Sequence, residues 1–255
     1  MIVQHYGVPT APFACIPPLA QRASLELSPL DFIRRSPHAV ALQNYPLFVK
    51  PATVSSGLGI SQRNKVFNDE ELVKIIEALS AEFPTSTLIV ETFLPGTEYT
   101  VGIIGSGTQA RVIGIEEFVF LKGKVDAPID ESLPYDSRDP GLFALDVYGY
   151  ELKAQWSPNP QRFKIELDTE MGKGLSKVAL DAWRVIGCSD GGRIDLRCDV
   201  NGDANFVEVR VLSPFCMSIA QQHKCLGQSD SRDGATLVRL ARTCKKQWHI
   251  VFGIV

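Results

Sequence analysis

Residues 187–214 read GCSDGGRIDLRCDVNGDANFVEVRVLSP, and this stretch decides the fold. Residues 193–199 and 205–211 alternate polar and apolar side chains, a pattern that is typical of β-strands. Asn201-Gly202 lies between them, and this dipeptide is well suited to a two-residue type I′ turn. The stretch therefore predicts a β-hairpin.

A two-residue turn sets the pairing of this hairpin. Asp195 would face Glu208 and Arg193 would face Arg210, with all four side chains on one face. The other face would carry the apolar side chains, namely Ile194, Leu196, Val207 and Val209. Two opposed carboxylates repel and favour a cation between them, and a hard ion such as Mg²⁺ fits. The alternative is a diagonal salt-bridge ladder, in which each carboxylate pairs with the arginine diagonal to it.

The composition is that of an ordinary soluble globular protein. The chain has 255 residues, of which 45% are hydrophobic and 22% charged, and its net charge is −3. This length suits one large domain or two small lobes, and the charge gives no electrostatic reason to bind nucleic acid. Six scattered cysteines without a CxxC pair indicate reduced thiols. Without an apolar run of membrane-spanning length or a signal-peptide pattern, we expect a cytoplasmic protein with no membrane partner.

A second informative stretch, residues 45–61, reads YPLFVKPATVSSGLGIS. Residues 47–50 are a short apolar strand that ends in Lys50, and a loop of small residues, 53–59, follows it. The backbone of such a loop can approach a ligand closely, so strand, lysine and loop together indicate phosphate binding. The GKS/T ending of a P-loop is missing. A flexible connection with an exposed lysine is the alternative.

Two helices are predicted around a long polar loop. Residues 68–83 begin with Asn68 as N-cap, have a glutamate three residues later, and carry an apolar stripe. Residues 168–186 form the second helix, which Gly187 closes. The loop between them, residues 126–148, contains three prolines, and loops of this length are often lids or binding segments.

In their order along the chain, these motifs resemble the ATP-grasp superfamily and, within it, the D-alanine–D-alanine ligase branch. The residues that carry the resemblance are FVKPA (48–52), the loop 55–61, ETFLPGTEYTVG (91–102), YELK (150–153), GRID (192–195) and Glu208. The resemblance implies an α+β fold in which two lobes with mostly antiparallel sheets clamp a nucleotide. Residues 1–94 would form the first lobe, residues 95–225 the second, and residues 226–255 a C-terminal extension without an assigned role.

The resemblance also implies ATP and Mg²⁺ (or Mn²⁺) as cofactors. For the ATP phosphates it implies Lys50 and the backbone amides around Ser56 and Gly57, and it places Lys153 on a loop near the nucleotide. For adenine it implies Glu91 and the backbone up to Leu94, and for the ribose Glu98. Asp195 and Glu208 match metal ligands, in agreement with the pairing derived above. Arg193 matches the catalytic arginine that stabilises the anion developing during acyl transfer.

The activity implied is ATP- and Mg²⁺-dependent ligation of a carboxylate to an amine through an acyl phosphate. Such a reaction depends on positioning and charge neutralisation more than on a protein nucleophile. The partners implied are small-molecule carboxylate and amine substrates, namely amino acids. A homodimer is left open, although relatives of this kind often dimerise.

Four departures from the family bear on this activity. The resemblance implies an N-terminal domain before the point that matches Ile2, and we expect this chain to lack it. Arg210 stands where relatives have an asparagine that binds metal, and an arginine repels a cation. Pro214 lacks the N–H of an oxyanion-binding glycine, and Ala154 replaces a tyrosine. The alternative function is a catalytically impaired or truncated relative that binds nucleotide or acts as an interaction module. In a more distant alternative, Asp195 and Glu208 form only salt bridges.

Overall fold

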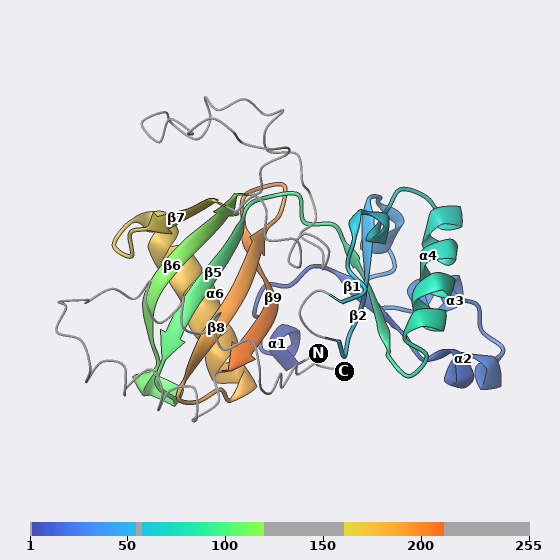
Figure 1. The fold of residues 1–255 in the computed structure, drawn as a ribbon, viewed down its shortest axis with the longest axis horizontal. Helices are drawn as coiled ribbons and strands as arrows, with labels where there is room; N and C mark the ends of the chain where they lie inside the picture. Colours follow the sequence, from blue (N-terminus) through green and yellow to red (C-terminus); the bar gives the residue numbers. More distant parts are fainter. Residues whose placement is uncertain (1, 55–57, 120–160, 212–255) are drawn as a thin grey trace. The chain divides into compact units, whose positions relative to one another are not determined.

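The computed structural model describes residues 2–54, 58–119 and 161–211. These residues form two units, each with its own antiparallel sheet and hydrophobic core (Figure 1). The predicted α+β fold with two antiparallel sheets is confirmed. The first unit contains residues 11–54 and 58–93, and the second contains residues 2–10, 94–118 and 162–211.

The first unit is a four-stranded sheet, in the order β1-β4-β2-β3, covered by helices. Its strands are β1 (Phe13–Ile16), β2 (Leu47–Pro51), β3 (Lys65–Val66) and β4 (Leu88–Thr92), and its helices are α2 (Leu19–Leu25), α3 (Pro29–Arg34) and α4 (Asp69–Glu82). Leu47 and Val49 of β2 pack in one core with Ile76 of α4. Because side chains alternate along a strand, Lys50 projects from the face opposite to the helices.

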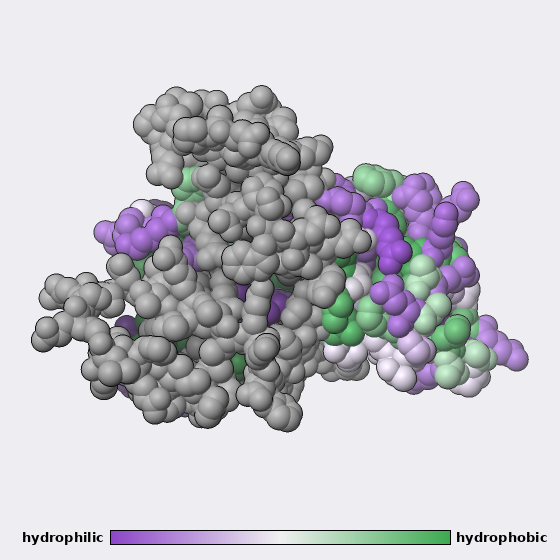
Figure 2. Space-filling model, in the orientation of Figure 1, coloured by the Kyte–Doolittle hydropathy of each residue, from purple (hydrophilic) through white to green (hydrophobic). Residues whose placement is uncertain are grey.

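Helix α4 begins and ends as predicted. The Asn68 side chain accepts a hydrogen bond from the Glu71 backbone N–H at 2.9 Å, and the Glu71 carboxylate accepts one from the Phe67 N–H at 2.9 Å. The apolar stripe is buried, namely Leu72, Ile75, Ile76 and Leu79. On the face seen in Figure 2, hydrophilic side chains are interspersed with hydrophobic ones over the described part of this unit, as on an ordinary solvated surface.

The second unit is a five-stranded sheet, in the order β7-β6-β5-β8-β9, with one long helix packed on it. Its strands are β5 (Glu98–Ile104), β6 (Arg111–Val119), β7 (Gln161–Ile165), β8 (Gly191–Cys198) and β9 (Ala204–Val211), and its helices are α1 (Ile2–His5) and α6 (Glu170–Ile186). The predicted end of α6 is confirmed, because Gly187 takes the left-handed conformation at φ 79°. Trp183 is fully buried, and its indole N–H donates to the Gly105 carbonyl oxygen at 3.0 Å.

Residues 2–10 pack with the second unit, although the expected first lobe was residues 1–94. Val3 and Val8 are 0% and 4% exposed in the core around α6. The Phe206 N–H of β9 also donates to the Pro9 carbonyl oxygen at 2.8 Å. The segment therefore completes the core of a sheet whose strands come much later in the sequence.

The turn of the β8–β9 hairpin is longer than predicted. The Asp199 N–H donates to the Asp203 carbonyl oxygen at 2.9 Å, which leaves residues 200–202 as a three-residue loop. Gly202 has φ 86°, the left-handed conformation that glycine supplies at the end of such loops. The prediction of a two-residue turn at Asn201-Gly202 was therefore wrong.

A β-bulge restores the predicted pairing farther along the hairpin. The register changes by one residue just after Asp195, which makes Val207 the extra residue on β9. The charged residues consequently lie opposite each other as predicted, Asp195 with Glu208 and Arg193 with Arg210. Because of the bulge, the apolar face differs from the one predicted: Phe206 lies in the core, where Val207 was expected.

Within the described ranges, no helix combines the length and apolar character that a membrane span requires.

Candidate functional site

The five-stranded sheet has one apolar face and one charged face. The apolar face packs against α6 through side chains from several strands, including Tyr99, Val101, Ile103, Ile115, Ile194 and Leu196. Residues paired on neighbouring strands point to the same face. Thr100 pairs with Asp195, which pairs with Glu208, so these side chains lie in a row across the opposite face.

Asp195 is the buried centre of the charged face. It is 6% exposed, and its Oδ1 accepts a hydrogen bond from the Thr100 hydroxyl at 2.7 Å. Its Oδ2 lies 3.1 Å from Nη2 of Arg193. Burial raises the pKa of Asp195; the Arg193 charge opposes the rise and the Glu208 charge adds to it. The pairing with Thr100 and Arg193 compensates part of the cost of burying this carboxylate.

Arg193 lies between the two carboxylates. Its Nη2 is also 3.6 Å from Oε1 of Glu208, so one guanidinium contacts both acids. Burial disfavours the charged form of Arg193, but the carboxylates of Asp195, Glu208 and Glu98 outweigh it and raise the pKa. The cation that the opposed carboxylates were expected to need is therefore supplied by the protein itself.

Arg210 adds a second guanidinium to the same cluster. Its Nε donates to Oε1 of Glu208 at 2.6 Å, and Glu208 is two residues earlier on the same strand. Of the two diagonal salt bridges weighed from the sequence, the one between Arg193 and Glu208 is present. The cluster thus contains two carboxylates and two arginines.

The cluster as arranged does not fit Mg²⁺ or Mn²⁺. Such ions require free oxygen ligands in nearly octahedral geometry. Both Asp195 oxygens and Oε1 of Glu208 already contact donors, and the two arginines cancel the two negative charges. In the part of the chain that the structure describes, no group of three or more His, Cys, Asp or Glu residues could hold a metal ion. The metal assignment to Asp195 and Glu208 stays an untested prediction, and the contacts of these two carboxylates with the arginines argue against it.

Glu98 lies on the charged face next to this cluster. It pairs across β5 and β8 with Arg197, and its Oε2 is 3.8 Å from Nη1 of that arginine. The Glu98 side chain is 26% exposed. This carboxylate is thus partly accessible, and its predicted contact with ribose is untested.

Lys50 and Glu91, both predicted to bind the nucleotide, meet in the first unit. Lys50 Nζ lies 2.7 Å from Glu91 Oε1, and the two side chains are 17% and 19% exposed. The register explains the contact, because Phe48 faces Glu91 and Lys50 is two residues farther along the same face of β2. Leu94, also predicted at the nucleotide, follows β4 and is 9% exposed.

Several residues of the predicted site lie outside the described ranges. These are Ser56 and Gly57 of the small-residue loop, Lys153, and the two departures Ala154 and Pro214. The long polar loop and the C-terminal extension, residues 126–148 and 226–255, also lie outside them.

The sequence analysis assigned no role to three residues of the charged face. Thr100 binds Asp195, Arg197 pairs with Glu98, and Glu116 faces Thr100 from β6 at 9% exposure. Alternation along residues 98–104 was the available signal, since it places Glu98 and Thr100 on one face. Which residues lie opposite them depends on the pairing of β5 with β6 and β8.

Comparison with known proteins assigns most of the chain to one family. A family model described as "D-ala D-ala ligase C-terminus" matches residues 2–219. The D-alanine–D-alanine ligase of Paraburkholderia phymatum is 28% identical over 209 residues, which are 82% of this chain and 54% of that protein. The chain therefore spans about half the length of this curated relative.

Solved structures have the same fold. The D-alanine–D-alanine ligase from Bacillus anthracis gives a TM-score of 0.57 at 17% identity and covers 95% of this chain and 65% of that chain. The structure of that ligase complexed with ATP gives a TM-score of 0.52 at 17% identity, and the match covers 82% of this chain and 52% of that chain. The VanG D-Ala:D-Ser ligase from Enterococcus faecalis gives a TM-score of 0.51 at 21% identity, and the match covers 82% of this chain and 49% of that chain. At these identities the likeness concerns the fold.

Proposed function

Because the chain belongs to the D-alanine–D-alanine ligase C-terminal family, we propose that it acts as an ATP-dependent ligase of a carboxylate and an amine. The observation that carries the proposal is Arg193, whose side chain is 15% exposed and whose guanidinium contacts two carboxylates at the positions that the family resemblance assigns to the catalytic hairpin. The ATP complex of the Bacillus anthracis ligase supports the choice of nucleotide. The names of the relatives support amino acids as substrates.

The chemistry proposed proceeds in two steps. A substrate carboxylate oxygen attacks the γ-phosphorus of ATP, ADP leaves, and an acyl phosphate forms. The amine of the second substrate then attacks the acyl carbon, a proton is lost from nitrogen, and phosphate leaves. Both steps build up negative charge on oxygen, which a preorganised cation stabilises.

Two basic residues are proposed to supply that charge. Lys50, held by Glu91 and partly exposed, would bind phosphate oxygens as a compact ammonium. Arg193 would stabilise the oxyanion of the tetrahedral intermediate, because Asp195 and Glu208 hold its guanidinium in one orientation. No step is assigned to Mg²⁺, since the hairpin as arranged does not fit that ion.

One observation favours a second candidate function. Arg210 Nε lies 2.6 Å from the carboxylate that the family resemblance assigns to metal. A relative whose metal position is blocked in this way would bind nucleotide without turning it over. The second candidate is therefore a catalytically impaired nucleotide-binding protein.

The experiment that separates these functions combines binding with turnover. Thermal unfolding of the full chain is measured with and without ATP, in MgCl₂ and in EDTA, and phosphate release is then measured with amino acids present. A ligand at a hundredfold excess over its Kd stabilises the native state by about 2.7 kcal/mol. Protection together with amino-acid-dependent phosphate release supports the ligase, and protection without release supports the impaired relative. No protection by ATP contradicts both.

A further inference from the structure

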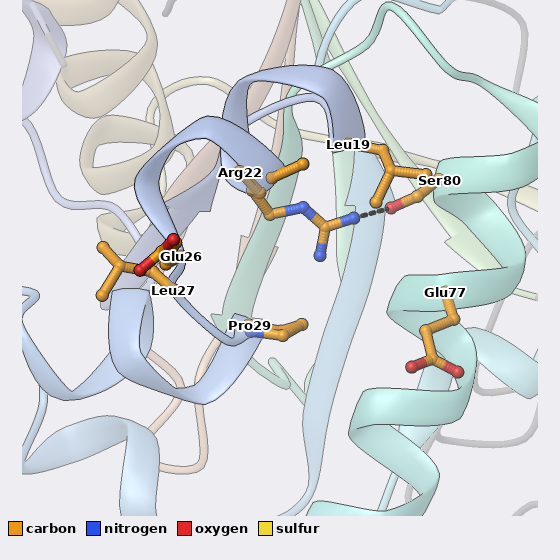
Figure 3. A pocket seen from close by; sticks show the side chains of 8 residues that line it. Leu19, Arg22, Glu26, Leu27, Pro29, Glu77 and Ser80 are labelled. Carbon is orange, nitrogen blue, oxygen red and sulfur yellow. Dashed lines mark hydrogen bonds between the residues drawn. The ribbon is translucent and has the colours of Figure 1, made fainter.

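A cavity of about 280 Å³ lies among the helices of the first unit (Figure 3). It is bounded by α2, the segment that leads into α3, and α4. Its wall is mostly apolar, with four polar residues that the figure labels, Arg22, Glu26, Glu77 and Ser80. The volume is near the lower end of the range for small-molecule sites, about 300–1,000 Å³, so a small ligand fits it.

Arg22 is a buried cation in this cavity, and the hydrogen bond described for its side chain has a neutral acceptor. It is 5% exposed, and its Nη2 donates to the Ser80 hydroxyl at 2.7 Å. Its Nε is buried without a hydrogen-bond partner among the described residues. Burying a charge is costly unless an opposite charge pairs with it, and a guanidinium can bind a carboxylate through two parallel hydrogen bonds. The site therefore favours a carboxylate ligand.

Glu77 restricts which carboxylate can bind. Its side chain extends from α4 on the side of the cavity toward which the Arg22 guanidinium projects (Figure 3). The Glu77 charge also raises the pKa of Arg22 against the lowering effect of burial, so the two groups interact electrostatically. A simple anion would be repelled by Glu77, whereas a ligand with both charges would satisfy both groups.

We propose that this cavity binds a free α-amino acid as its zwitterion, with the carboxylate on Arg22 and the ammonium group on Glu77. The apolar wall then accommodates a small side chain. Glu26 also lines the pocket, on the side away from Glu77 (Figure 3). This assignment uses the opposite charges of the two ends of the cavity and its small volume.

The cavity is separate from the residues proposed to bind nucleotide. It lies among the helices, and α4 covers the face of the sheet that bears Leu47 and Val49. Lys50 and Glu91 project from the opposite face. The inference therefore does not depend on ligase activity, and it would hold for an impaired relative as well.

The test is isothermal titration calorimetry of the full chain with L- and D-alanine, without nucleotide or metal. Acetate and methylammonium are the probes that carry only one of the two charges. We expect alanine to bind and each single-charge probe to bind at least about tenfold more weakly, the effect of losing one charge-assisted hydrogen bond. Glu77→Gln should weaken alanine binding by a similar factor, and Arg22→Gln should abolish it.

Glu70→Gln is the matched control, because Glu70 is an exposed residue of α4 outside the cavity wall. Absence of alanine binding, acetate binding as tight as alanine, or equal affinities for Glu77→Gln and the native chain would each overturn the proposal. If Arg22→Gln does not fold, Glu77→Gln decides, since Glu77 is exposed. Loss of amino-acid binding with ATP protection retained would refute this inference alone and leave the proposed function intact.

Discussion

Glu208 accepts two guanidiniums at once, and the chemistry of the hairpin depends on this contact. Arg210 Nε lies at 2.6 Å and Arg193 Nη2 at 3.6 Å from the same carboxylate oxygen. A guanidinium stays charged at every accessible pH. A divalent ion that approaches Glu208 must therefore displace a cation that cannot be neutralised.

Arg210→Asn should make the hairpin a better metal site. The change removes one positive charge beside Glu208 and substitutes an amide oxygen, which is a possible ligand. We expect the affinity for Mn²⁺ to rise at least about tenfold, because a charge pair near a protein surface is worth up to about 4 kcal/mol. Titration followed by electron paramagnetic resonance measures free Mn²⁺ directly.

Arg111→Asn is the control for this change in net charge, because Arg111 is an exposed residue of β6 in the same unit. An equal rise in both variants would show a general electrostatic effect. No rise in Arg210→Asn would show that Arg210 does not block the metal.

Lys50→Ala should abolish the protection that ATP gives against unfolding. The change removes the ammonium proposed to bind phosphate and leaves Glu91 without its partner at 2.7 Å. The variant should itself lose about 1–3 kcal/mol of stability, because a half-buried carboxylate is left unpaired. The measurement is the shift in unfolding temperature on adding ATP, compared with Lys74→Ala on the exposed surface of α4. ATP protection that survives in Lys50→Ala contradicts the phosphate assignment.

At the scale of elements, the contact between β8 and α6 holds the charged hairpin in place. Gly192 of β8 lies against Trp183 of α6. A Cβ added at Gly192 would meet the backbone oxygen of Arg210 and would lie 2.9 Å from the Trp183 ring. Only a residue without a side chain allows the strand, its neighbour β9 and the helix to pack this tightly.

The same substitution should have opposite effects at two glycines of this unit. Gly192→Ala should lower the free energy of unfolding by about 1–3 kcal/mol, since the backbone must shift to relieve the overlap. Gly174→Ala should raise it by up to about 1 kcal/mol, because alanine is the better helix former. An added Cβ at Gly174 of α6 meets nothing within 4 Å. Urea unfolding measures the free energy of unfolding of both variants. A change of the same sign in the two variants would contradict the packing described.

At the scale of the whole molecule, the chain enters the second unit, leaves it to form the first, and then returns. Residues 2–10 precede the first unit in sequence but pack with the second. The N-terminal segment therefore contributes to the stability of a core formed mainly by residues 94–118 and 162–211. Each unit otherwise has its own core.

Val3→Ala should therefore destabilise the second unit selectively. Val3 is fully buried beside α6, so truncation should cost about 2 kcal/mol there. Hydrogen exchange measured by mass spectrometry should become faster in α6 and β8 and stay unchanged in α4. Ile2→Ala is the control, because Ile2 is 49% exposed. Equally faster exchange in α4 would contradict the division into units.

Local patterns in the sequence determined most of the elements. Alternation located β8 and β9, and the caps Asn68 and Gly187 located the ends of α4 and α6, because these signals act over a few neighbouring residues. The family resemblance located Lys50 and Glu91, which the structure brings together. The opposition of Asp195 and Glu208 was also predicted, but from a turn that the chain does not use.

Only the tertiary structure decided the rest. The bulge at Val207 compensates for the longer turn, and no local sequence pattern indicates this bulge. The two-residue strand β3 exists through its pairing with β2, and Thr100 reaches Asp195 only because β5 lies beside β8. The sequence by itself thus determined which residue types are available, where the main helices and strands run, and the family. Which charges meet was decided by packing, because contacts between residues far apart in sequence depend on register and on the cores that align the strands.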